Sequence, residues 1–312
     1  MEHALAKSVL ASLPRGPVAF RYFKDRYALQ LLAYAASEGR SLSEMRRGRF
    51  GPLLQKPLVR RVLGDRGGRH VDWEVLDNYF PAHTERYRLT FGLWGDARDW
   101  WWNQTTRRGF NLVLQLNFSA AHDRAYRRYI CPHAEDHPFV RYGHPVNETE
   151  PHTLAWSRID IDFDTGEALI EEIQSDWVRD AADLATIALA NLCEGRLTVP
   201  WWLFGSRCDA RQAYRYVEHV LSMHRTIWDQ AVMAATLWLL RERLCIRDIY
   251  MHTHEDGSRL KGIEDMLPPR SVYERVPRSF CFERVAGLPR FLRKARLRRP
   301  TWPSCEFWKL RV

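Results

Sequence analysis

The stretch LAWSRIDIDFDTGEALIEEIQSDW, residues 154–177, decides the fold of this 312-residue chain. Apolar and acidic residues alternate in its first half, and a second apolar run follows Thr165 and Gly166. A period of two is typical of a half-buried strand, and a glycine between two such runs indicates a tight turn. The stretch therefore predicts an antiparallel β-hairpin with strands at 154–164 and 167–176.

Further strand-like runs lie on both sides of the hairpin, and they are rich in β-branched and aromatic residues. The predicted strands cover 87–94, 110–118, 246–253, 279–285 and 306–312. Apolar residues at three- and four-residue spacing predict helices over 22–38, 120–129, 226–244, 257–266 and 289–296. We therefore expect an α/β (α+β) protein with a central, mostly antiparallel sheet flanked by helices.

The chain length favours one core with helical elaborations. Residues 1–64 have a helical pattern, so 1–85 is predicted to be a helical N-terminal extension of an α/β domain over 86–312. Residues 178–225 are rich in helix-forming sequence and are predicted to be a helical insertion in that domain.

The composition is that of a globular protein, with 46% apolar and 27% charged residues. The first 13 residues form an amphipathic pattern rather than a signal peptide, and no uncharged apolar run reaches membrane-spanning length. The six cysteines include no C-x-x-C pair, which argues against a zinc site and a disulfide scaffold. We expect a cytoplasmic protein with reduced thiols, no metal and no membrane contact.

Positive charge is high and unevenly placed, with a net charge of +9 and a sequence pI near 9.4. The segment RFLRKARLRR, 290–299, interleaves basic and apolar residues. A helix that lies on the domain with its charges outward explains this pattern, and so does a surface that binds nucleic acid or another polyanion. The second explanation predicts weak, salt-sensitive binding through Arg293, Lys294 and Arg296.

Polar side chains gather at the end of the hairpin. On an extended strand Ile170, Glu172, Gln174 and Asp176 share one face, because side chains repeat every two residues. Two carboxylates and an amide at a strand end can position a substrate or act as a general base. A structural network that ties the strand to the following helices explains the same residues equally well.

Two histidines follow the predicted strand at 246–253. His252 and His254 would share a face and offer imidazole groups for acid–base chemistry or substrate contacts. No third ligand stands at a recognisable spacing, so hydrogen-bonded loop histidines are expected rather than a metal site.

The acidic residues of the first hairpin strand imitate a calcium-binding loop. A calcium loop has acidic residues at alternate positions and a final glutamate, and here these would be Asp160, Asp162, Asp164 and Glu171. The loop position that needs glycine is occupied by Thr165. We expect a solvated acidic face of the strand instead.

The order of the predicted elements over residues 86–312 resembles that of the GNAT superfamily of N-acyltransferases. Two early strands, a long hairpin, a helix, a strand, a short helix and two final strands make this order. The segment SVYERVPRSFCF, 271–282, is similar to the end of the short helix before the sixth strand of that family. The resemblance implies acyl transfer, with Tyr273 as general acid. The polar strand end supplies Glu172 as the candidate base or substrate anchor.

The chain departs from the family at the coenzyme site. GNAT enzymes hold the coenzyme A pyrophosphate in a glycine-rich R/Q-x-x-G-x-G/A turn that opens the helix after the hairpin. Residues 175–225 contain no such turn, since Gly195 and Gly205 lack the spacing. The chain therefore binds no acyl-CoA or binds it in another way, and the cofactor stays unknown.

The segment LIEEIQSDW, 169–177, is also similar to a strand-end motif of large multidomain phage and plasmid proteins. Ser175 and Trp177 of this segment are further candidate substrate-binding residues. In those proteins a Trp-led helix and a strand ending in threonine follow, as Trp228 and Thr253 do here. The sequence hypothesis is an atypical GNAT-like acyltransferase or a related group-transfer enzyme. The alternative is a non-catalytic module that binds nucleic acid or protein, and the oligomeric state stays open.

Overall fold

The computed structural model describes residues 1–64, 73–95, 103–130, 138–200, 208–263, 268–297, 299 and 305–312. An eight-stranded sheet organises these residues. Its strands are β1 (Val18–Tyr22), β2 (Glu85–Trp94), β3 (Asn111–Asn117), β4 (Thr153–Asp162), β5 (Glu167–Gln174), β8 (Asp248–His252), β9 (Glu283–Ala286) and β10 (Glu306–Arg311). They lie in the order β1-β2-β3-β4-β5-β8-β10-β9, and a separate ribbon pairs β6 (Thr198–Val199) with β7 (Cys208–Asp209).

The predicted hairpin is confirmed. β4 and β5 pair antiparallel from Asp162 opposite Glu167, and the turn contains Gly166 in the left-handed region at φ +67°. β8 joins the same sheet as the parallel neighbour of β5, whereas the other strand pairs of this sheet are antiparallel. The mixed α/β architecture with a mostly antiparallel sheet is therefore the one that the sequence predicts.

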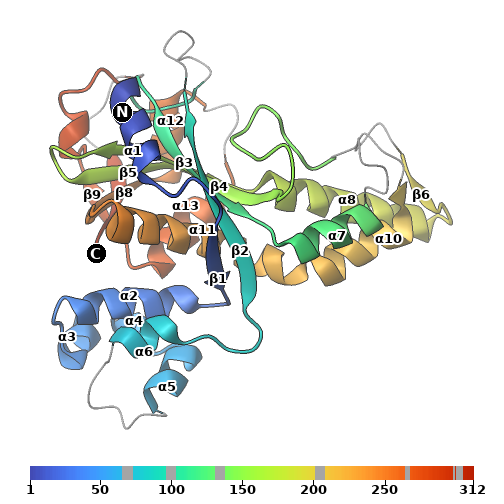
Figure 1. The fold of residues 1–312 in the computed structure, drawn as a ribbon, viewed down its shortest axis with the longest axis horizontal. Coiled ribbons are helices and arrows are strands. Elements are labelled where there is room, and N and C mark those ends of the chain that lie inside the picture. The colour runs from blue at the N-terminus through green and yellow to red at the C-terminus, as the bar shows by residue number, and fades with distance from the viewer. Residues whose placement is uncertain are drawn as a thin grey trace.

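Helices cover the sheet and extend beyond it (Figure 1). The α-helices are α1 (His3–Ser12), α2 (Arg26–Ser37), α3 (Leu42–Arg47), α4 (Gly51–Leu54), α5 (Pro57–Gly64), α6 (Trp73–Asn78), α7 (Ala120–Tyr129), α8 (Asp176–Cys193), α10 (Ala210–Arg215), α11 (Ser222–Trp238), α12 (His254–Lys261) and α13 (Arg270–Ser279). The π-helical turns η1 (Tyr216–Val220) and η2 (Leu239–Arg243) continue α10 and α11, and η3 (Arg290–Leu292) is a 3₁₀ turn.

The central helix α11 is buried because it lies between the sheet and α2. Its Thr236 hydroxyl is 2.8 Å from the Ser157 hydroxyl of β4. On its other side, the Ala234 carbonyl accepts a hydrogen bond from the Gln30 amide of α2 at 3.1 Å. α11 therefore joins the sheet to the helices that precede β2.

The N-terminal segment contains a strand that its helical pattern did not predict. β1 pairs with β2 from Val18 opposite Leu89 to Tyr22 opposite Glu85 and forms one edge of the sheet. Residues 1–85 are therefore not a purely helical extension. A five-residue edge strand with partly exposed side chains carries little periodic signal, and Tyr22 belongs to it rather than to the following helix.

Near the C-terminus the predicted basic helix over 289–296 is reduced to the three residues of η3. Phe291 and Leu292 are buried, while Arg293 and Lys294 point into solvent. The apolar residues of the segment therefore hold it on the domain, as the first sequence explanation requires, but without a regular α-helix.

The expectation of a solvated acidic face is wrong for Asp160, which is buried. Its carboxylate accepts from the Arg107 guanidinium at 2.6 Å and from the Met1 ammonium at 2.9 Å. Both partners are remote in sequence, so the alternation of acidic and apolar residues could not reveal them.

Within the described ranges no helix combines the length and the apolar character that crossing a membrane requires. The five cysteines of these ranges are free thiols, and Cys131 lies outside the described residues.

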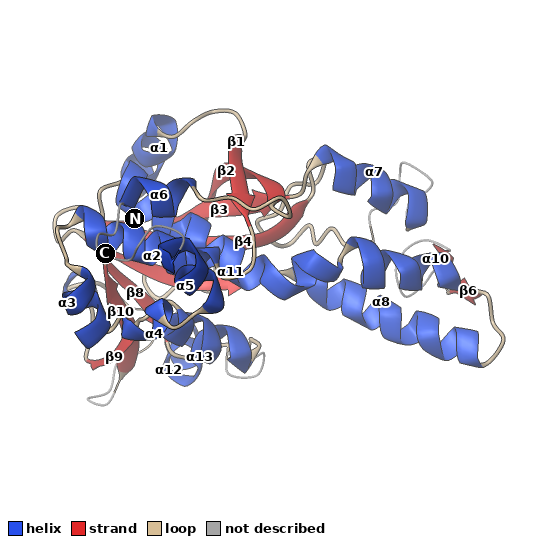
Figure 2. Ribbon diagram, turned by 90° about the horizontal axis from the view of Figure 1, so that it is seen from below, coloured by secondary structure: helices blue, strands red, loops and turns tan. Residues whose placement is uncertain are grey.

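Figures 1 and 2 show α7, α8 and α10 projecting from the sheet as an arm, with β6 toward its far end. Buried aromatic and histidine side chains hold the base of the arm. The Trp177 indole of α8 donates to the Tyr216 hydroxyl at 2.8 Å, and His122 Nε2 of α7 lies 3.0 Å from the same hydroxyl. Phe118 stacks on His122 with ring centroids 3.4 Å apart. Trp177, a candidate substrate-binding residue, therefore lies in the core.

His224 joins this group from α11, with Nδ1 2.8 Å from the Tyr87 hydroxyl of β2. Burial, and secondarily the neighbouring His122, lower the pKa of His224 to about 3. His224 therefore stays neutral in the folded protein at pH values where an exposed histidine is charged.

We predict that the folded protein loses stability as pH falls below about 6.5, because only the unfolded chain then protonates His224. Between about pH 6.5 and pH 5 this one group lowers the free energy of unfolding by about 2 kcal/mol. Urea unfolding of the parent and of His224→Gln, which keeps a hydrogen-bonding group toward Tyr87 but does not titrate, checks this. Equal acid sensitivity of the two proteins would contradict the assignment.

Candidate functional site

A β-bulge in β5 brings two consecutive glutamates into the centre of the sheet. Ile159 and Arg158 are neighbours on β4, but their partners on β5 are Ile170 and Glu172, so Glu171 is an extra residue. An extra residue interrupts the two-residue alternation of a strand. Ile170 and Ile159 consequently enter the main core, whereas Glu172 lies with Arg158 on the opposite face. The predicted common face of Ile170 and Glu172 is therefore not formed.

Glu172 and Arg158 form a buried ion pair across the hairpin. The Arg158 guanidinium also donates to the backbone carbonyl of Asn103 and lies 5.3 Å from the Trp94 ring centroid. Burial alone would raise the pKa of Glu172, but the charges of Arg158 and Lys261 outweigh burial and lower it. Glu172 is therefore an ionised carboxylate whose charge holds a buried arginine in place.

The other bulge residue, Glu171, is fully buried and has its own donors. Thr106 donates from its backbone N–H at 3.0 Å and from its hydroxyl at 2.8 Å, and His252 Nε2 lies 3.1 Å from the carboxylate. Burial opposes ionisation, but the hydrogen bond with His252, followed by the charge of Lys261 and the Thr106 backbone N–H, lowers the pKa of Glu171 to about 2. Burial lowers the pKa of His252, so its neutral ring must carry the Nε2 proton.

Lys261, the last residue of α12, completes the group. Its side chain is only 1% exposed, and its ammonium donates to the Glu171 backbone carbonyl at 3.1 Å. Burial lowers the pKa of Lys261, the charge of Glu172 opposes this, and Arg158 adds to the lowering. Lys261 therefore releases its proton more readily than a surface lysine does. We call Arg158, Glu171, Glu172 and Lys261 the bulge cluster.

The bulge cluster lies where β5 and β8 part. Their parallel pairing ends with Ile170 opposite Met251, although β5 continues to Gln174. Beyond that point the backbone carbonyl of Glu171 meets the Lys261 side chain instead of a neighbouring strand. The end of α12 therefore occupies the place where the sheet pairing stops.

Tyr273 reaches the same place from the buried side of α13. Its side chain is 1% exposed, and the Lys261 ammonium lies 6.0 Å from its ring centroid. The hydroxyl approaches the backbone of Ile173 without a hydrogen bond of normal geometry. Burial, and then the charge of Glu172, raise the pKa of Tyr273 well above its ordinary value. The hydroxyl therefore keeps its proton and has a free hydrogen-bonding capacity.

The two predicted histidines separate because the strand ends at His252. Thr253 caps α12, with its hydroxyl accepting from the Asp256 N–H, and His254 is the first residue of that helix. His254 Nε2 lies 2.9 Å from the Pro268 carbonyl, and its ring centroid is 6.4 Å from that of Tyr273. Only His252 touches the bulge cluster.

Gln174 and Asp176 form a second polar group at the end of the hairpin. The Asp176 carboxylate accepts from Gln174 at 2.5 Å and Trp156 at 3.3 Å, and lies 2.7 Å from His144 Nδ1. Burial opposes ionisation of Asp176, but His144 outweighs it, and the pKa is lowered. Asp176 is therefore an ionised carboxylate beside the bulge cluster rather than part of it.

Ser175 has a structural task at the start of α8. Its hydroxyl accepts from the Val178 N–H at 3.1 Å and donates to the Leu154 carbonyl at 2.5 Å. These bonds satisfy the first turn of the helix and tie it to β4. The Ser175 hydroxyl is therefore occupied within the fold.

Lys261 and Arg158 were not predicted from the sequence. Lys261 stands in a polar helix, where lysine is normally solvated. One sequence signal could have identified Arg158. In a hairpin of unbroken register it would lie opposite Glu171, and the bulge moves its partner by one residue to Glu172.

Among the described residues, no group of three or more His, Cys, Asp or Glu side chains is arranged to hold a metal ion. No family model, curated protein or solved structure matches the chain.

We predict that Glu172→Gln lowers the free energy of unfolding by about 3 kcal/mol, because it leaves the Arg158 charge buried without its counter-ion. Urea unfolding at neutral pH measures this loss. Glu255→Gln, at an exposed position of α12, is the matched control and should change stability by less than about 0.5 kcal/mol. Similar small effects of both changes would mean that the buried pair does not support the fold.

Proposed function

We propose that the chain is an atypical GNAT-like group-transfer enzyme whose reaction centre is the bulge cluster together with Tyr273. The order of elements supports the proposal, since antiparallel strands, a hairpin, the parallel β8 and the pair β10 and β9 follow one another as in that family. The observation that carries it is the position of Tyr273, whose ring centroid is 6.0 Å from the ammonium of a buried lysine of lowered pKa and whose own pKa the charge of Glu172 raises.

The proposed reaction is acyl transfer from a thioester to an amine or hydroxyl. In the uncharged form that its burial favours, Lys261 accepts the proton of the attacking group, and Glu172 anchors the positive charge that forms. The carbon–sulfur bond breaks as the new bond to the acyl carbon forms. Tyr273 passes a proton to the departing sulfur as Lys261 replaces that proton, so the net transfer is from the attacking group to the thiol and the tyrosine stays neutral.

The N-terminus of α8 is not suited to bind the pyrophosphate of an acyl-CoA donor, so the donor must bind through other contacts. Ser175 already accepts from the Val178 N–H, and Asp176 adds a negative charge to the first turn. A carboxylate at this position repels the phosphate groups that a helix N-terminus otherwise attracts. Acyl-CoA can therefore act as donor only if its phosphates bind elsewhere.

The bulge cluster is closed to solvent, because Lys261 and Tyr273 are each 1% exposed. A substrate reaches the Tyr273 hydroxyl only when α13 separates from β5. In this proposal opening of that contact precedes chemistry.

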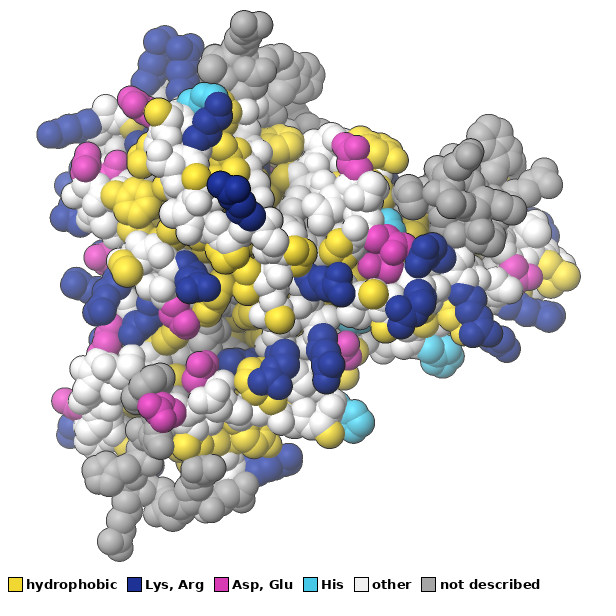
Figure 3. Space-filling model, viewed as in Figure 1, with side chains coloured by type: hydrophobic (Ala, Val, Ile, Leu, Met, Phe, Trp, Pro, Cys, Tyr) yellow, Lys and Arg dark blue, Asp and Glu magenta, His cyan; other side chains and the backbone are white. Residues whose placement is uncertain are grey.

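A non-catalytic module that binds nucleic acid or protein is the second candidate function. The observation that favours it is the closure of the bulge cluster, in which Arg158 and Glu172 pair with each other and Lys261 donates to a backbone carbonyl. Basic side chains are by contrast accessible, and Figure 3 shows Lys and Arg spread over both the body and the arm. Binding without thioester turnover would distinguish this candidate from the enzyme.

We predict that Tyr273→Phe lowers thiol release from acetyl-CoA, in the presence of amine acceptors, by about 100-fold. Its free energy of unfolding should change by less than about 1 kcal/mol, because the hydroxyl makes no hydrogen bond of normal geometry. Tyr142→Phe, at an exposed position, is the control and should keep full activity.

A thiol-reactive dye measures the release, and urea unfolding measures stability. Two results would overturn the proposal: no protein-dependent release with the parent, or equal release by the parent and Tyr273→Phe.

A further inference from the structure

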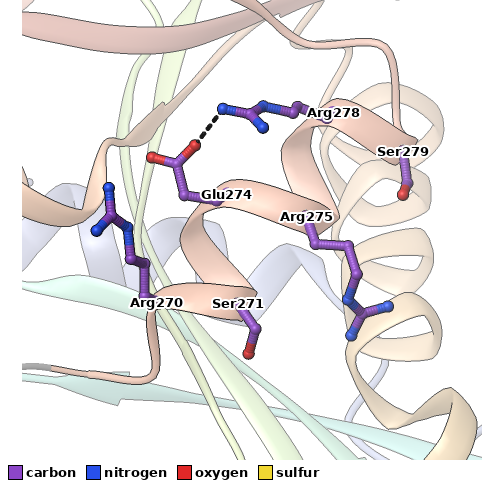
Figure 4. A pocket seen from close by; sticks show the side chains of 6 residues that line it. All are labelled: Arg270, Ser271, Glu274, Arg275, Arg278 and Ser279. Atoms are coloured by element: carbon purple, nitrogen blue, oxygen red, sulfur yellow. Dashed lines mark hydrogen bonds and ion pairs between the residues drawn. The ribbon is translucent and has the colours of Figure 1, made fainter.

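α13 presents two different faces. At about 100° per residue, Val272, Tyr273 and Val276 fall on one arc of the helix, and these residues are buried. The opposite arc borders an open groove of about 580 Å³ (Figure 4). The groove is lined by Arg270, Ser271, Glu274, Arg275, Arg278 and Ser279. The helix that carries Tyr273 inward therefore carries three arginines and two serines outward.

Carboxylates neutralise part of this positive charge. Arg278 pairs with Glu274 at 2.6 Å, as Figure 4 shows, and Arg284 of β9 approaches the same carboxylate at 2.7 Å. Arg275 pairs with Asp229 of α11 at 2.5 Å. Arg270 has no carboxylate partner among the described residues. Exposed ion pairs are weak, and a guanidinium has five N–H donors, so the outer arginines can still bind an anion.

We propose that the outer face of α13 binds the phosphate backbone of a nucleic-acid strand. Arg270 and Arg278 are eight residues apart, a rise of about 12 Å along the helix. A strand repeats its phosphates along the backbone, so a row of this length can contact more than one phosphate of the same strand. The row is longer than a single phosphate group needs.

The chemistry of the groove also suits phosphate. Arginine matches phosphate oxygens with two parallel N–H donors, and serine hydroxyls are common phosphate contacts. Ser271 and Ser279 border the row at either side, and the net charge of the chain is +9. This binding needs no reaction at Tyr273. It therefore goes beyond the proposed group transfer and can be tested independently of it.

The test compares two double variants that lose the same charge. Arg270→Gln with Arg278→Gln removes the ends of the row, and Arg275 is kept because its partner Asp229 is buried. Arg211→Gln with Arg215→Gln removes two exposed arginines of α10 in the arm and is the control.

Fluorescence anisotropy with a labelled oligothymidine of about 20 nucleotides measures affinity between about 50 and 200 mM salt. The α13 variant should bind about tenfold more weakly at the low salt, and its slope of log affinity against log salt should fall by about 1.4, or about 0.7 for each lost contact. The arm variant should match the parent. Equal losses in both variants, or none in the α13 variant, would overturn the proposal.

Competition separates phosphate from charge alone. Unlabelled oligothymidine should displace the labelled strand from the parent, whereas polyglutamate at equal ionic strength should not. Equal displacement by polyglutamate would overturn the proposal. Tyr273→Phe should bind the strand as the parent does, whatever its effect on thiol release.

Discussion

The buried ion pair of Arg158 and Glu172 is the interaction on which the centre of this structure depends. A charge removed from water must be paired, because an isolated buried ion costs several kcal/mol. The bulge at Glu171 meets this requirement by turning Glu172 toward Arg158 while Ile170 stays in the apolar core. One inserted residue thus places a buried, charged cluster on one face of an otherwise apolar hairpin.

The same bulge also determines the position and the environment of Lys261. Pairing between β5 and β8 ends just before Glu171, and the carbonyl left without a strand partner is met by Lys261. The two glutamates attract positive charge to this place, while burial opposes it. A lysine held between these effects is neither a firmly charged surface group nor an inert core residue, which is why the proposed proton transfer is located there.

The sequence predicted the parts of the fold that local patterns determine. The hairpin followed from alternation and a glycine turn, and apolar spacing predicted a helix over 22–38, which the structure shows as Arg26–Ser37. β1 was missed because five edge residues carry little periodicity. The bulge was missed because register is fixed by a neighbouring strand, and the burial of Asp160 was missed because Arg107 is remote in the chain. Of the predicted site residues, His252 contacts Glu171 and Tyr273 lies beside Lys261, whereas Trp177 belongs to the base of the arm.

The most direct test of this account is the titration of Lys261 itself. NMR of the protein with isotope-labelled lysine side chains, with Lys261→Met used to assign the resonance, gives the pKa of that amine in the folded state. The account predicts a value below the ordinary lysine value of about 10.4, because burial outweighs the attraction of Glu172. A Lys261 pKa at or above that value would show that the attraction of the glutamates outweighs the effect of burial. It would contradict the proposal that Lys261 accepts a proton where the pairing of β5 and β8 ends.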